Sequence, residues 1–123
     1  MERNGKEILI VKDEPDIPML VKSRLESYHF EVASVSDGDE AMEKIYKERP
    51  DLVILDLMLP GKSGYELCMK IKQDQELKST PVIMYSSRMG DLDKNLGYSC
   101  GADGYVPKRN SFNKMLDMID KFI

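Results

Sequence analysis

Acidic, hydroxyl and basic side chains follow four short apolar segments of this sequence. Asp13 and Glu14 come soon after residues 8–11, and Asp56 comes directly after residues 52–55. Ser86 directly follows residues 82–85, and Lys108 comes shortly after residues 105–106. Carboxylates gathered at one place repel one another, and a hard divalent cation such as Mg²⁺ relieves that repulsion. A carboxylate beside Mg²⁺ can attack a phosphoryl group in line and form an acyl phosphate.

Two further side chains suit the same reaction. Lys108 would neutralise charge on the transferring group, and the Ser86 hydroxyl would donate a hydrogen bond to it. Any one of these residues taken alone is more often a helix cap or a solvated charge. Their joint occurrence after four apolar segments is much harder to attribute to capping, and it favours a site for phosphoryl transfer.

Short apolar runs alternate with amphipathic stretches along the chain. The runs predict strands covered on both faces, and they span residues 8–11, 30–35, 52–55, 82–85 and 105–106. Apolar residues at helical spacing follow each run: Ile17, Val21, Leu25 and Tyr28; Ala41 and Ile45; Leu67 and Ile71; Leu92 and Leu96; Met115, Leu116, Ile119 and Phe122. Five strand–helix units predict an α/β fold with a parallel sheet between two helical layers. In such a sheet the site forms outside the carboxyl ends of the strands.

The composition indicates one ordinary globular domain over residues 1–123. The chain has 18 Lys and Arg against 22 Asp and Glu, a net charge of −4, so it lacks the basic footprint of a nucleic-acid or anionic-membrane binder. The first apolar run is too short for a signal peptide or a membrane span. Cys68 and Cys100 fit neither a disulfide framework nor a CxxC site, so we expect reduced thiols and a cytoplasmic protein.

Two enzyme-like patterns near Asp56 are incomplete. Gly61-Lys62-Ser63 mimics the end of a phosphate-binding loop, but the first glycine of that loop would have to stand at position 56. Phosphatases of the haloacid dehalogenase type need a second aspartate two residues after the nucleophile, and Met58 stands there. A hydrolase of similar fold is therefore disfavoured, and we expect no multiple-turnover enzyme acting on an external substrate.

The chain resembles the receiver domain of two-component response regulators from about Glu7 to Phe122. Four segments carry the resemblance, in order and at similar spacings: residues 8–15, residues 50–61 with Gly64, residues 81–87 and residues 101–108. The resemblance implies a doubly wound, flavodoxin-like three-layer fold with five helices and a five-stranded parallel sheet of order 2-1-3-4-5.

The resemblance also implies a role for each residue of the site. Asp56 would accept a phosphoryl group from a phosphohistidine, and Asp13, Asp56 and the backbone carbonyl of Met58 would hold Mg²⁺. Lys108 would pair with Asp56 and then with the phosphoryl group. Ser86 would move toward that group, and Tyr105 would swing inward behind it. Such a local change of charge that biases a two-state element is what a switch requires.

The resemblance further implies a donor and an output surface. His29, the one histidine of the chain, is expected in the turn before the second strand and away from the acidic cluster. The donor would therefore be a separate sensor histidine kinase or phosphotransfer protein. The fourth helix, fifth strand and fifth helix would form the surface that a downstream protein, an effector domain or a second copy of the chain binds.

Lys12 and Arg109 depart from the family pattern. The family usually has an acidic residue at the position of Lys12, and an ammonium there competes electrostatically with the metal. Lys12 either points into solvent or pairs with Asp56. The family commonly has proline at the position of Arg109; because a non-proline cis bond costs about 2.5–4 kcal/mol, a trans bond is expected. These departures motivate an alternative function, a degenerate receiver that binds partners without phosphorylation.

Overall fold

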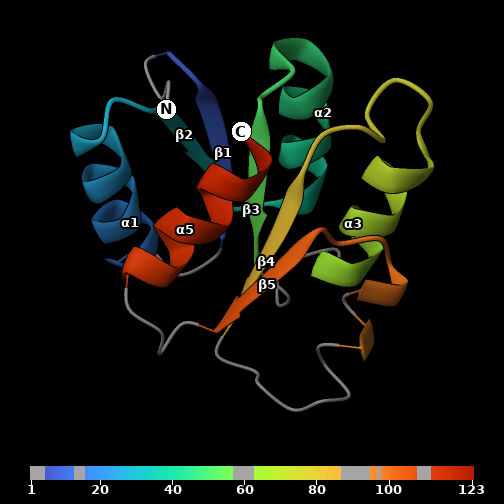
Figure 1. Cartoon of the computed structure of the whole chain (residues 1–123). Coiled ribbons are helices and arrows are strands. Elements are labelled where there is room, and N and C mark those ends of the chain that lie inside the picture. Colours follow the sequence, from blue (N-terminus) through green and yellow to red (C-terminus); the bar gives the residue numbers. More distant parts are fainter. Residues whose placement is uncertain (1–4, 13–15, 57–62, 87–94, 97, 108–111) are drawn as a thin grey trace.

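The structure, a computed structural model, is built on a central five-stranded parallel sheet (Figure 1). It describes residues 5–12, 16–56, 63–86, 95–96, 98–107 and 112–123. The strands are β1 (Glu7–Val11), β2 (Glu31–Val35), β3 (Leu52–Leu55), β4 (Val82–Ser86) and β5 (Gly104–Pro107). Their order is β2-β1-β3-β4-β5, which confirms the predicted order.

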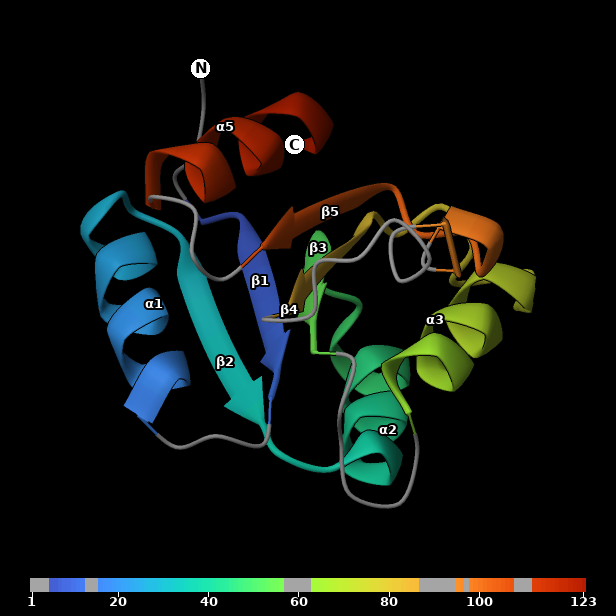
Figure 2. The same ribbon diagram turned by 90° about the horizontal axis from the view of Figure 1, so that it is seen from below.

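Helices cover both faces of this sheet, with α1 and α5 on one side and α2 and α3 on the other (Figure 2). Their bounds are α1 (Asp16–Ser27), α2 (Gly38–Glu48), α3 (Gly64–Gln73) and α5 (Phe112–Phe122). Residues 95, 96, 98 and 99 are also helical, where the fourth helix is predicted. The three-layer arrangement is therefore confirmed. None of the helices in the described ranges is long and apolar enough to cross a membrane.

Successive residues of the central strands point into two separate hydrophobic clusters. The first cluster lies toward α2 and α3 and includes Leu9, Val11, Val53, Leu55, Met84, Tyr105, Ala41, Ile45, Leu67 and Ile71. The second lies toward α1 and α5 and includes Ile8, Ile10, Leu52, Ile54, Ile83, Val106, Val21, Leu25, Met115 and Ile119. The unbroken apolar runs of the sequence are thus strands buried on both faces, as predicted.

Asp51 fixes the register between β1 and β3. Its backbone N–H donates to the carbonyl of Glu7 at 2.8 Å, and its carboxylate accepts from the N–H of Glu7 at 2.7 Å. From there the two strands pair residue by residue until Val11 lies opposite Leu55. The residues that follow these strands are consequently brought side by side.

Lys72 holds the turn that leads into β5. Its Nζ lies 2.6 Å from the Asp103 carboxylate and donates to the carbonyl of Thr80 at 2.7 Å. The same carboxylate accepts from the N–H of Val82 at 2.8 Å, which joins this turn to the start of β4. Gly101 stands next to Lys72 with φ 98°, and a Cβ there would lie 2.8 Å from Lys72 Cγ. Only glycine suits this backbone conformation and this close approach.

We expect Gly101→Ala to lower the free energy of unfolding by about 2 kcal/mol, since it combines a left-handed backbone with crowding against Lys72. Gly5→Ala is the matched control, because Gly5 has φ 77° but nothing within 4 Å of the place that an added Cβ would take. That variant should lose about 1 kcal/mol, the cost of the left-handed backbone alone. Urea unfolding measures both losses. Equal losses would show that the Lys72 side chain moves away from the added methyl group without lowering the free energy of unfolding.

Candidate functional site

The strand register gathers Lys12, Asp56 and Tyr85 at the carboxyl edge of the sheet. Val11 pairs with Leu55, and Leu55 in turn pairs with the β4 residue just before Tyr85. The hydrogen-bond ladder continues one step further, because the N–H of Asp56 donates to the carbonyl of Val11 at 3.0 Å. The residues that come next, Lys12, Asp56 and Tyr85, therefore lie in one row across β1, β3 and β4.

A buried ion pair joins Lys12 to Asp56. The distance from Lys12 Nζ to Asp56 Oδ2 is 3.1 Å, and the two side chains are 2% and 5% exposed. The same ammonium lies 5.9 Å from the ring centroid of Tyr85, within reach of a cation–π interaction. Of the two alternatives for Lys12, the solvent-facing one is wrong and pairing with Asp56 is confirmed. The physical reason is that a buried carboxylate requires a compensating charge, and Lys12 stands beside it in the row.

The structure describes some of the other predicted site residues and not others. Ser86 is the last residue of β4 and pairs with Pro107 of β5 in the sheet register. Tyr105 is 5% exposed and already lies inside the hydrophobic cluster on the α2 and α3 side. The remaining predicted residues lie outside the described ranges: Asp13, Met58, Lys108 and Arg109.

Asp56 is the one predicted metal ligand whose surroundings the structure describes. Its carboxylate has the hard oxygens that Mg²⁺ prefers. However, Oδ2 contacts the Lys12 ammonium, which repels a second cation. Across the described ranges, no three side chains of His, Cys, Asp or Glu are grouped so that they could hold a metal ion. The described residues thus fit a divalent site only in part, with one ligand and one opposing charge.

Sequence analysis missed Tyr85 as a member of this site. It ends an apolar run, and such a residue is by default part of the strand core. The structural register reveals it: Val11, Leu55 and Met84 stand in one row of the sheet, so Lys12, Asp56 and Tyr85 stand in the next. A lysine beside an aspartate and an aromatic ring is a chemically meaningful group, although no single run reveals it.

Cys68 and Cys100 form no second reactive centre. Both are free, and the Cys68 thiol donates to the carbonyl oxygen of Cys100 at 3.6 Å. Burial raises the pKa of the Cys68 thiol to about 12, so this thiol stays protonated near neutral pH and is a poor nucleophile. The prediction of reduced thiols is consistent with this arrangement.

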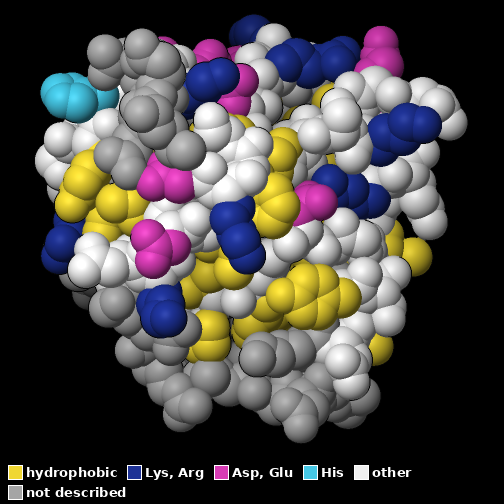
Figure 3. All heavy atoms as spheres, in the orientation of Figure 1, with side chains coloured by type: hydrophobic (Ala, Val, Ile, Leu, Met, Phe, Trp, Pro, Cys, Tyr) yellow, Lys and Arg dark blue, Asp and Glu magenta, His cyan; other side chains and the backbone are white. Residues whose placement is uncertain are grey.

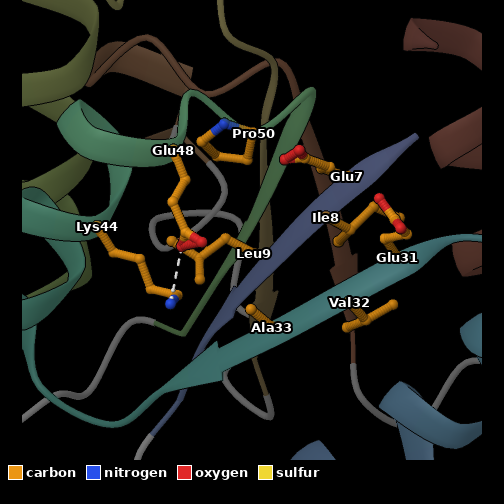
Figure 4. Close-up of a pocket in the computed structure, with 9 residues that line it drawn as sticks. All are labelled: Glu7, Ile8, Leu9, Glu31, Val32, Ala33, Lys44, Glu48 and Pro50. Carbon is orange, nitrogen blue, oxygen red and sulfur yellow. Dashed lines mark ion pairs between the residues drawn. The ribbon is translucent and has the colours of Figure 1, made fainter. Parts of the chain in front are cut away.

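A pocket of about 300 Å³ lies beside the first halves of β1 and β2 (Figure 4). Its lining comprises Glu7, Ile8, Leu9, Glu31, Val32, Ala33, Lys44, Glu48 and Pro50. Lys44 and Glu48 form an ion pair of 2.8 Å at its wall. The pocket contains none of the predicted site residues, so the chemistry is to be sought at the carboxyl edge of the sheet.

A doubly wound parallel sheet of this order is the flavodoxin-like class of α/β proteins, in which the site lies beyond the carboxyl ends of the strands, where Asp56 stands. The chain matches the response regulator receiver domain family over residues 8–120. It therefore belongs to that family.

Solved structures support the same assignment. The BeF3-activated N-terminal receiver domain of Klebsiella pneumoniae RstA is 31% identical, with a TM-score of 0.89, and the match covers 94% of this chain and 97% of that one. A putative response regulator from Chloroflexus aurantiacus is 28% identical, with a TM-score of 0.93 and coverage of 97% and 98%. The Mn²⁺-bound form of response regulator Rcp1 is 29% identical, with a TM-score of 0.81 and coverage of 94% and 90%.

Proposed function

We propose that this chain is a phospho-accepting signalling switch in which Asp56 receives a phosphoryl group from a phosphohistidine. The donor is a partner histidine kinase or phosphotransfer protein. The observation that supports this most is the buried Asp56 carboxylate, held beside an ammonium at the edge of the sheet. An Asp56 oxygen attacks phosphorus, the P–N bond breaks, and its electron pair goes to the imidazole nitrogen of the donor. The chain acts as a stoichiometric acceptor rather than as a multiple-turnover enzyme.

The neighbouring strand ends supply the rest of the proposed mechanism. Lys108 stabilises the negative charge of the phosphoryl group, and Ser86 donates a hydrogen bond to it. Tyr105 already occupies an inward, buried position. In this proposal, phosphorylation stabilises Tyr105 in that position and thereby biases the surface around β5.

In this proposal Asp13, Asp56 and the backbone carbonyl of Met58 would hold Mg²⁺ through their oxygens. When bound, it would supply charge neutralisation at the phosphoryl oxygens. A similar response regulator is found in a Mn²⁺-bound form, which supports a divalent cation here. Because Lys12 adds a positive charge at Asp56, we propose that Mg²⁺ binds more weakly than it would without that ammonium.

The proposed output surface is formed by α5, β5 and the helical residues 95, 96, 98 and 99. Leu96 and Tyr98 are 43% and 50% exposed and can therefore contact a partner directly. Figure 3 shows hydrophobic side chains among Lys, Arg, Asp and Glu on this face. A downstream protein, an effector domain or a second copy of the chain would bind there, and we propose that it does so in the cytoplasm.

Incubation with phosphoramidate and Mg²⁺, followed by intact-mass measurement, tests the acceptor role. We expect wild type to gain the mass of one phosphoryl group and Asp56→Asn to gain none, because the amide is not a nucleophile. Asp117→Asn, which changes an exposed acid on α5, is the matched control and should behave as wild type. An unmodified wild type, or equal gain on Asp56→Asn, would refute the proposal.

The Lys12–Asp56 ion pair favours one alternative function, the degenerate receiver. If the ammonium holds Asp56 permanently, the chain would bind its partner without phosphorylation. Wild type would then gain no phosphoryl mass with either phosphoramidate or a kinase donor. Its affinity for a partner would also be the same before and after incubation with either donor, which distinguishes this function from that of a switch.

A further inference from the structure

We propose that Lys12 is a built-in counter-cation of the acceptor carboxylate and that it takes over part of the electrostatic role of the divalent ion. This inference rests on the proposed function, in which Asp56 is the phosphoryl acceptor. It predicts that phosphorylation of Asp56 persists when divalent ions are removed, and that Lys12 determines how strongly the reaction depends on them.

The geometry places the ammonium where such a cation is needed. Lys12 Nζ lies 3.1 Å from an oxygen of the reacting carboxylate. Both side chains are almost fully shielded from water, so their attraction is screened far less than that of a surface pair. The exposed pair Lys44–Glu48 shows the contrast, with side chains that are 34% and 45% exposed.

Tyr85 restricts where the ammonium can go. Its ring lies 5.9 Å from Lys12 Nζ and packs against the hydrophobic cluster on the α1 and α5 side. The attraction of a cation to an aromatic face strengthens when the cation is desolvated. The ammonium is thus kept at the edge of the sheet. Its flexible four-carbon stem still allows a short movement from a carboxylate oxygen to a phosphoryl oxygen.

The change of charge on phosphorylation shows why this cation matters. Before transfer, the charges of Lys12 and Asp56 cancel. The phosphorylated side chain carries roughly two negative charges, as other protein phosphates do. With Lys12 present the pair is left with about one negative charge, whereas a neutral residue at position 12 would leave about two. A divalent ion is correspondingly less necessary when Lys12 is there.

Phosphoramidate as donor, with intact mass as the readout, tests this inference in EDTA and in Mg²⁺. An Asp56 oxygen attacks phosphorus, the P–N bond breaks, and the nitrogen keeps the electron pair and leaves as ammonia after taking a proton from water. We expect the wild-type rate in EDTA to lie within about tenfold of the rate in Mg²⁺. Lys12→Met should lose at least about 100-fold in EDTA and recover in Mg²⁺, as expected when one charge-stabilising group is removed. Lys12→Arg keeps the charge and should retain the reaction in EDTA.

Mg²⁺ binding measured by calorimetry gives a second readout that needs no phosphoryl transfer. Removing the ammonium removes its repulsion of the metal, so Lys12→Met should bind Mg²⁺ at least about tenfold more tightly than wild type. Lys44→Met removes a lysine from the exposed pair on α2 and should leave the affinity unchanged. Unchanged affinity in Lys12→Met would overturn the inference.

The outcomes separate this inference from the proposed function. Wild type that is phosphorylated in Mg²⁺ but not at all in EDTA overturns the role of Lys12 and leaves Asp56 as the acceptor. Wild type that is phosphorylated in neither condition overturns the acceptor function itself, and the inference with it. This comparison uses the unaltered chain, so it does not depend on whether a variant folds.

Discussion

Lys12→Met is expected to lower the free energy of unfolding by about 3 kcal/mol, because it removes the ammonium that lies 3.1 Å from the buried Asp56 carboxylate. Asp56→Asn should cost a similar amount, since it leaves the ammonium buried beside a neutral group. The double variant should cost clearly less than the two single losses together, by at least about 2 kcal/mol. Urea unfolding in EDTA measures all four proteins without a contribution from bound divalent ions.

The exposed ion pair Lys44–Glu48 is the matched control for this double-mutant cycle. Its Nζ–Oε2 distance of 2.8 Å is shorter than that of the buried pair, yet its side chains are 34% and 45% exposed. An exposed helical pair of this spacing contributes about 0.3–0.5 kcal/mol, and added salt should abolish it. The Lys12–Asp56 coupling should persist in 1 M salt because the pair is shielded from mobile ions. A Lys12–Asp56 coupling energy as small and salt-sensitive as that of Lys44–Glu48 would show that Lys12 and Asp56 do not form a buried ion pair.

A strong coupling would not mean that the ion pair makes the fold more stable than an apolar substitute would. The attraction of unit charges 3.1 Å apart is about 5 kcal/mol at an effective dielectric of 20, but each charge has also lost its water. Much of that attraction only offsets the free energy lost when the two charges are removed from water. What the pair achieves is to keep a charged carboxylate buried at the edge of the sheet. The stability of the fold comes mainly from the two hydrophobic clusters.

The layers of the fold could be predicted from the sequence because burial on both faces leaves unbroken apolar runs. The runs at residues 8–11 and 52–55 coincide with β1 and β3 to within one residue. The faces of α2 and α3 were equally predictable, since Ala41, Ile45, Leu67 and Ile71 are all buried. Strand order was different: alternation of strands and helices implies a parallel sheet, but only the family resemblance supplied the order.

The orientation of Lys12 could not be predicted from the sequence pattern. A lysine after a strand can extend into water or fold onto a nearby acid, and local spacing does not distinguish these. The decision depends on a contact with Asp56, 44 residues away along the chain. Asp51 sets that contact by fixing the pairing of β1 with β3. The charge of the site is therefore a property of register, which sequence periodicity does not encode.

Tyr105→Ala is expected to lower the free energy of unfolding by about 4 kcal/mol, because it leaves a cavity in the cluster on the α2 and α3 side. Tyr105→Phe keeps the ring and should cost less than about 1.5 kcal/mol. Urea unfolding measures both. Phosphoryl gain from phosphoramidate should survive in each folded variant, since the Lys12 ammonium lies against Tyr85 on the other side of the sheet.

The response to phosphorylation should nevertheless differ between the two variants. If Tyr105 couples the acceptor to the output surface, wild type and Tyr105→Phe should change their amide hydrogen exchange over β5 and residues 95–100 when Asp56 is phosphorylated. Tyr105→Ala should lose most of that change because the ring buried in the cluster on the α2 and α3 side is gone. A folded Tyr105→Ala that is phosphorylated and still shows the full change would remove Tyr105 from the switch. Loss of phosphoryl gain in that variant would instead assign Tyr105 to the acceptor site.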